Sequence, residues 1–137
     1  MSNVTQAARN LITANFALEP GERLTLVLAP GRDALRAAIA SVAPEFGVEV
    51  VHFALEEEND YELPERMARA LQETNAALIS TKRSYTHTDG VRGAAAAGAR
   101  IATNAALTEA QLVEVAQLMQ KNRPSQARLK IRAQHDP

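Results

Sequence analysis

Short apolar segments alternate with longer segments of helical periodicity, and this alternation limits the possible folds of the chain more than any other feature. The apolar segments predict strands at 23–29, 48–55, 76–80 and 100–103. Apolar residues spaced three and four apart predict helices at 3–16, 34–46, 65–73, 89–97 and 108–120. Strands joined through helices of this length pair in parallel. We therefore expect an α/β fold, a Rossmann-like three-layer sandwich with a mainly parallel four-stranded sheet.

Turn and capping residues indicate where these elements begin and end. Pro20 and Gly21 favour a tight turn between the first helix and the first strand. Asp89 and Thr108 each stand at a predicted helix start, where a side-chain oxygen can accept a hydrogen bond from a free backbone amide. The periodicity ends after the last helix. We expect one domain over residues 1–120 and a basic tail or edge extension over residues 121–137.

Composition narrows the class of protein. The chain has no cysteine, which removes disulfides and thiolate metal sites and is typical of a reducing compartment such as the cytoplasm. No apolar run approaches the roughly 18 residues of a membrane helix, so we expect no membrane association. Five of the 15 Lys and Arg residues lie in residues 121–137. This tail could attract anions, but it lacks interleaved aromatic residues, and we do not expect nucleic acid as a partner.

A dense polar segment, residues 80–92, follows the third predicted strand. Loops at the carboxyl ends of parallel strands face the crevice where ligands bind, and a helix start there favours an anion. The segment is therefore the candidate site for a small-molecule ligand, with Ser84, Thr86, His87, Thr88 and Arg92 as the binding residues. A structural role remains open as well, because hydroxyl groups commonly cap helices and a single histidine often anchors a loop.

Other segments are weaker candidates for a binding or catalytic site. The Pro30-Gly31-Arg32 turn lacks both glycine-rich phosphate-binding patterns, so we do not expect a nucleotide. The acidic segment 56–62 could hold a hard cation but is more typical of a solvated surface. The three histidines, His52, His87 and His135, lack the spacing of a helical zinc pair. We expect no metal and no cofactor within this chain; His87 is the weak candidate for a catalytic general base.

Several motifs together resemble a known family. They are Ser84-Tyr85-Thr86-His87-Thr88 with Arg92, Ala97-Gly98-Ala99-Arg100-Ile101, Ala8-Arg9-Asn10-Leu11-Ile12 before Pro20-Gly21-Glu22, and Leu107-Thr108. Together they resemble the amino-terminal domain of the aminopeptidase T-like leucyl aminopeptidases and the related dihydroxypyridine dioxygenases, in which the polar loop and the following alanine-glycine-alanine-arginine run occur in this order. The resemblance covers roughly Val4 to Val115.

The resemblance implies a Rossmann-like domain whose loop 80–92 faces an interdomain cleft, while carboxylates and histidines of a second domain bind the metal. This chain ends where the second domain would begin. We therefore expect an accessory or truncated relative that is inactive alone and whose loop meets a ligand or a metal-binding partner chain. Two alternatives stay open: a self-associating module that forms homo-oligomers through faces such as the alanine-rich helix 89–97, and a small enzyme that uses His87 as general base.

Overall fold

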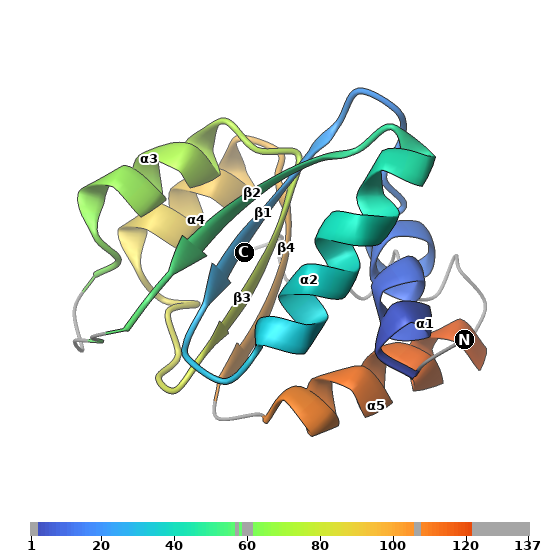
Figure 1. Cartoon of the computed structure of the whole chain (residues 1–137). Coiled ribbons are helices and arrows are strands. Elements are labelled where there is room, and N and C mark those ends of the chain that lie inside the picture. The colour runs from blue at the N-terminus through green and yellow to red at the C-terminus, as the bar shows by residue number, and fades with distance from the viewer. Residues whose placement is uncertain (1–2, 57, 59–61, 106–107, 122–137) are drawn as a thin grey trace.

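The computed structural model describes residues 3–56, 58, 62–105 and 108–121 (Figure 1). Strands and helices alternate along the chain as the sequence predicts. In chain order the elements are α1 (Asn3–Asn10), a π-helical turn (Leu11–Asn15), β1 (Arg23–Leu28), α2 (Asp33–Val42), a 3-10 turn (Ala43–Phe46), β2 (Glu49–Ala54), α3 (Glu65–Gln72), β3 (Ala76–Thr81), α4 (Asp89–Ala96), β4 (Arg100–Ala105) and α5 (Glu109–Lys121).

The four strands form one sheet in the order β2-β1-β3-β4, and every pair is parallel. On the central strand β1, Leu26 lies opposite His52 of β2 and Leu78 of β3. The chain first adds β2 on one side of β1 and then crosses to add β3 on the other side. Strand order therefore reverses between β1 and β3, which is where parallel sheets of this kind open a ligand crevice at their carboxyl edge.

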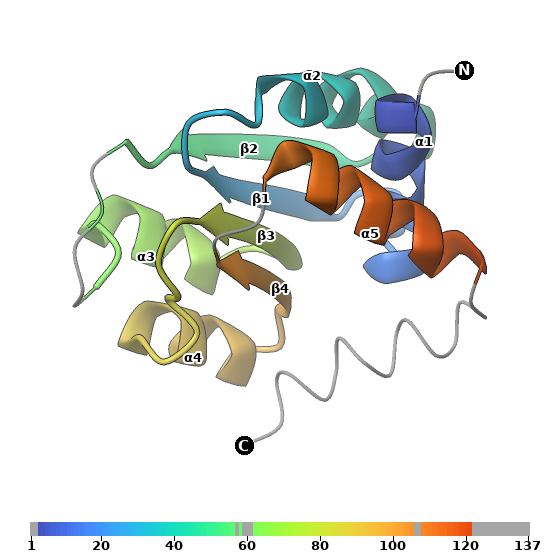
Figure 2. The ribbon, with the colours of Figure 1, turned by 90° about the horizontal axis from the view of Figure 1, so that it is seen from below.

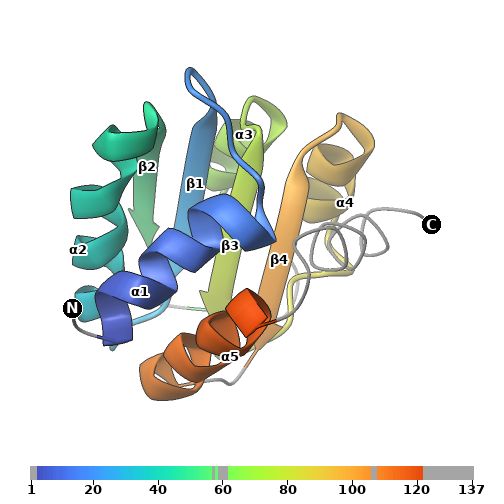
Figure 3. The same cartoon turned by 90° about the vertical axis from the view of Figure 1, so that its right-hand side faces the viewer.

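Helices cover both faces of the sheet, which confirms the expected three layers (Figure 3). Alternate residues of β1 point to opposite faces. Leu24, Leu26 and Leu28 pack with α1, α2 and α5, whereas Val27 packs with α3 and α4. Because β1 is buried from both sides, it is apolar at nearly every position, as the sequence pattern indicated.

Several element boundaries differ from the predicted ones; for example, α2 ends at Val42 and a 3-10 turn covers Ala43–Phe46. Two further differences follow from backbone hydrogen bonds. The first helix is α-helical only to Asn10 and continues as a wider π turn, in which the Phe16 amide donates to the Leu11 carbonyl at 2.9 Å. The fourth strand continues past residue 103, because Asn104 and Ala105 still pair with the end of β3. Both features depend on backbone hydrogen bonds that apolar periodicity does not report.

The predicted tail lies outside the described residues, except that α5 extends to Lys121. Within the described ranges, every helix is too short or too polar to cross a bilayer.

Candidate functional site

The carboxyl edge of the sheet carries the loops that follow β1, β2 and β3, and Figure 2 views the fold from this side. The crevice expected between β1 and β3 is bridged by Arg32, which is 8% exposed. Its Nε donates to Ser80 Oγ at 3.1 Å, and one of its terminal nitrogens donates to the Pro30 carbonyl at 2.6 Å. A side chain of the protein itself therefore fills the usual ligand position.

A carboxylate of the protein also occupies the start of α2. The Leu35 amide donates to Glu109 Oε2 at 2.9 Å. The first turn of α5 places Glu109, since Thr108 Oγ1 accepts from the Gln111 amide at 3.2 Å and Gln111 Oε1 accepts from the Thr108 amide at 2.9 Å. This reciprocal pair confirms Thr108 as the cap of α5. A carboxylate is favoured at a helix start, so Glu109 ties α5 to α2.

Two glutamates from the acidic segment hold the loop 80–92. Glu58 accepts from the amides of Lys82 and Arg83, both at 2.8 Å. Glu62 accepts from the amides of Asp89 at 2.9 Å and Gly90 at 3.3 Å, at the start of α4. These contacts correct two expectations: Glu62 rather than the Asp89 side chain satisfies the helix start, and Glu58 and Glu62 bind backbone amides rather than forming only a solvated surface.

The residues predicted to bind a ligand fall into two groups. Thr88 is buried, and its hydroxyl donates to the Tyr85 carbonyl at 2.6 Å. Tyr85 itself is only 2% exposed and packs in the core between the sheet and α3 and α4. Thr88 therefore shapes the loop from inside, as the alternative structural interpretation proposed.

The other four predicted residues, Ser84, Thr86, His87 and Arg92, are exposed. The structure brings the hydroxyl groups of Ser84 and Thr86 within 3.3 Å of each other. Thr86 Oγ1 also lies 2.8 Å from Oγ1 of Thr103, a residue of β4 that sequence reasoning did not select. This hydroxyl contact joins the loop to the neighbouring strand.

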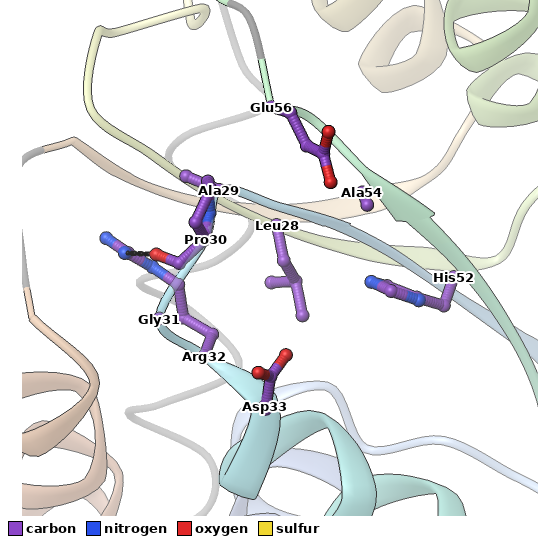
Figure 4. Close-up of a pocket in the computed structure, with 9 residues that line it drawn as sticks. All are labelled: Leu28, Ala29, Pro30, Gly31, Arg32, Asp33, His52, Ala54 and Glu56. Carbon is purple, nitrogen blue, oxygen red and sulfur yellow. Dashed lines mark hydrogen bonds between the residues drawn. The ribbon is translucent and has the colours of Figure 1, made fainter.

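Sequence reasoning also missed a small hollow of about 180 Å³ at the ends of β1 and β2 (Figure 4). Asp33, His52 and Glu56 converge on it above an apolar floor that includes Leu28 and Ala54. The only sequence signal is positional, because all of these residues lie at or near the carboxyl ends of neighbouring parallel strands.

Burial lowers the pKa of His52 from its ordinary value, and the positive charge of Arg36 lowers it further. The negative charge of Asp33 acts in the opposite direction, and the net pKa is lowered. His52 therefore favours the neutral imidazole, which has one donor and one acceptor nitrogen.

Within the described part of the chain, no group of three or more His, Cys, Asp or Glu side chains is placed to hold a metal ion.

Comparisons with known proteins show the fold. No protein-family model and no curated protein sequence matches the chain. Among solved structures, 2,5-dihydroxypyridine dioxygenase from Pseudomonas putida KT2440 matches with a TM-score of 0.60 at 14% identity, over 77% of this chain and 35% of that protein. A fatty acid ABC transporter substrate-binding protein from Thermomonospora curvata matches with a TM-score of 0.51 at 14% identity, over 93% of this chain and 32% of that protein.

The chain thus spans about a third of each of these proteins. The dioxygenase belongs to one of the two groups that the sequence motifs resemble. At this identity, the match shows a shared α/β fold, and the fold by itself does not assign an activity.

Proposed function

We propose that this chain is an accessory domain of a metal-dependent enzyme, related to the dihydroxypyridine dioxygenases and the aminopeptidase T-like peptidases, and inactive alone. Its loop 80–92 covers a metal site that a partner chain or domain provides. The observation that carries the proposal is a loop in which Ser84, Thr86, His87 and Arg92 are exposed. Glu58 and Glu62 fix the backbone of this loop. Such a loop can present groups to a partner without ordering them anew on binding.

The exposed groups suit a polar ligand held at the boundary between the two parts. Ser84 and Thr86 supply hydroxyl groups, His87 an imidazole, and Arg92 a permanent positive charge. Together they can donate hydrogen bonds to the oxygens of an anionic ligand whose other side faces the metal. In this role the residues position the ligand and exclude water, and the partner supplies the metal chemistry.

The fold comparison supports the same assignment of roles, in which this chain positions the ligand and the partner supplies the metal. A chain that matches about a third of a dioxygenase leaves most of that protein's length unmatched. The sequence resemblance implies that the metal ligands of the family lie in its second domain.

The experiment is the isolation of the affinity-tagged chain, expressed at its natural level in its own cells, followed by elemental analysis of the eluate. We expect a second chain in equal amount that carries a transition metal. Recovery of the tagged chain alone, or of a partner without metal, would contradict the proposal.

Paired variants connect the result to the loop. His87→Ala with Arg92→Ala should lower partner recovery at least tenfold, because both residues are exposed on the proposed contact surface. Glu19→Ala with Glu73→Ala is the matched control, since these exposed residues lie at the opposite, amino edge of the sheet. Equal loss in both variants would indicate a general defect and would contradict a contact through the loop.

A further inference from the structure

The hollow at the ends of β1 and β2 is a candidate binding site separate from the loop 80–92. Its polar side chains come from two directions: Asp33 from the first turn of α2, and His52 and Glu56 from β2 and the residues after it (Figure 4). Leu28 and Ala29, each 3% exposed, form part of its apolar floor. Polar groups that converge over an apolar floor are the usual composition of a small-molecule site.

The charges around the hollow favour a cation. Asp33 and Glu56 contribute two carboxylates, while the guanidinium of Arg32 is directed away from the hollow toward the Pro30 carbonyl and Ser80. The positive charge that acts on His52 is Arg36, which lies one helical turn after Asp33. Two cations, Arg32 and Arg36, thus lie near the hollow, but the charged groups that face it are the two carboxylates.

The shape of the hollow limits the size of the ligand. Its volume of about 180 Å³ is close to the roughly 150 Å³ of an engineered cavity that accepts a benzene-sized molecule. The hollow therefore has room for a ligand with one charged group and a short carbon chain.

We propose that this hollow binds a small aliphatic ammonium compound. Its ammonium group donates hydrogen bonds to the carboxylates of Asp33 and Glu56, and its carbon chain lies on Leu28 and Ala54. The neutral imidazole of His52 provides a further acceptor, because burial disfavours its charged form.

The test is a titration of the isotope-labelled full chain with butylammonium chloride, in which NMR measures the chemical shifts of the backbone amides. We expect saturable shifts at Asp33, His52 and Ala54, with a Kd on the order of 1 mM for a ligand of so few atoms. Butanol and sodium butyrate at equal ionic strength should produce no saturable shift at these amides. An absence of saturation with butylammonium, or equal binding of butyrate, would overturn the proposal.

Charge-removing variants locate the binding. Asp33→Asn with Glu56→Gln keeps the size of both exposed side chains and should weaken binding at least tenfold. Glu19→Gln with Glu73→Gln removes the same charge at the amino edge and should leave the Kd within twofold. Unchanged affinity in the first pair would overturn the site, and the dispersion of the amide spectrum verifies that each variant is folded. These outcomes are independent of whether the loop 80–92 binds a partner.

Discussion

Arg32 donates a 3.1 Å hydrogen bond from Nε to Oγ of Ser80, which joins the loop after β1 to β3. Both residues are buried, with 8% and 0% of their surface exposed. The contact crosses the point where strand order reverses, and it therefore fills the crevice that parallel sheets commonly use for ligands. The candidate binding surfaces of this chain lie on either side of that contact, at the loop 80–92 and at the hollow beside β2.

Ser80→Ala tests the contribution of this contact to stability. The substitution removes the acceptor of a buried, charged donor, so the free energy of unfolding should fall by about 1–3 kcal/mol. Urea denaturation measures this change. Ser84→Ala, at an exposed position of the same loop, is the control and should change the free energy by no more than about 0.5 kcal/mol. Equal effects at both positions would be inconsistent with the Arg32 contact.

Glu62→Gln tests the attachment of the start of α4. The variant loses the negative charge that the amides of Asp89 and Gly90 contact, and the free energy of unfolding should fall by about 0.5–1 kcal/mol. Hydrogen exchange at these two amides should become faster, whereas Glu73→Gln should leave it unchanged. Unchanged exchange in the Glu62 variant would show that the carboxylate does not hold the helix start.

Gly90 and Gly93 should respond oppositely to alanine. A Cβ atom at Gly90 would lie 2.9 Å from the Ala68 Cβ atom, so the close contact of α4 with α3 must open, at a cost of about 1–3 kcal/mol. The three atoms nearest to a Cβ atom at Gly93 all belong to the side chain of Gln72, at 3.2 Å or more, and this side chain can move. The higher helix propensity of alanine should then leave the Gly93 variant as stable as the wild type or more so. Thermal unfolding of both variants measures the contrast, and greater damage at Gly93 would contradict it.

Glu22 should make the free energy of unfolding depend on pH in the acidic range. Partial burial alone would raise the pKa of Glu22, but the 2.8 Å hydrogen bond from Arg100, the Glu19 amide and the charge of Arg100 outweigh this effect and lower the pKa. A carboxyl with a lowered pKa in the folded state contributes stability above its unfolded pKa of about 4.3 and loses it as pH falls through the folded value.

The measurement for Glu22 is the free energy of unfolding of wild type and Glu22→Gln between pH 7 and pH 3. The wild type should be more stable by about 1 kcal/mol at pH 7, a modest value because both partners are partly solvated. The difference should shrink as the carboxyl is protonated. A constant difference across this range would show that the Arg100 contact does not depend on the charge of Glu22.

Much of the fold follows from local sequence. Apolar runs such as 23–29 predict buried strands, because a parallel strand covered on both faces is apolar at consecutive positions. The same reasoning cannot identify the partners of a polar side chain. Glu58 and Glu62 look like members of a solvated acidic loop, yet each contacts amides more than 20 residues away in the sequence.

The candidate sites could be predicted only in part, because the sequence pattern does not identify which polar side chains come together. The density of polar residues in 80–92 identified a loop at the carboxyl edge, but it did not distinguish buried Thr88 from exposed Thr86. His52 looks isolated in the sequence, because Asp33 comes near it only through the parallel pairing of β1 with β2. Tertiary arrangement, rather than local pattern, assembles both sites.

The most direct test of the accessory-domain proposal compares amide hydrogen exchange of the isolated chain with that of the complex recovered from its own cells. We predict a metal-containing complex in which residues 84–92 become protected, while the amino-edge residues around Glu19 and Glu73 exchange at unchanged rates. A complex that lacks metal, or one that protects the amino edge and leaves residues 84–92 unchanged, would contradict it.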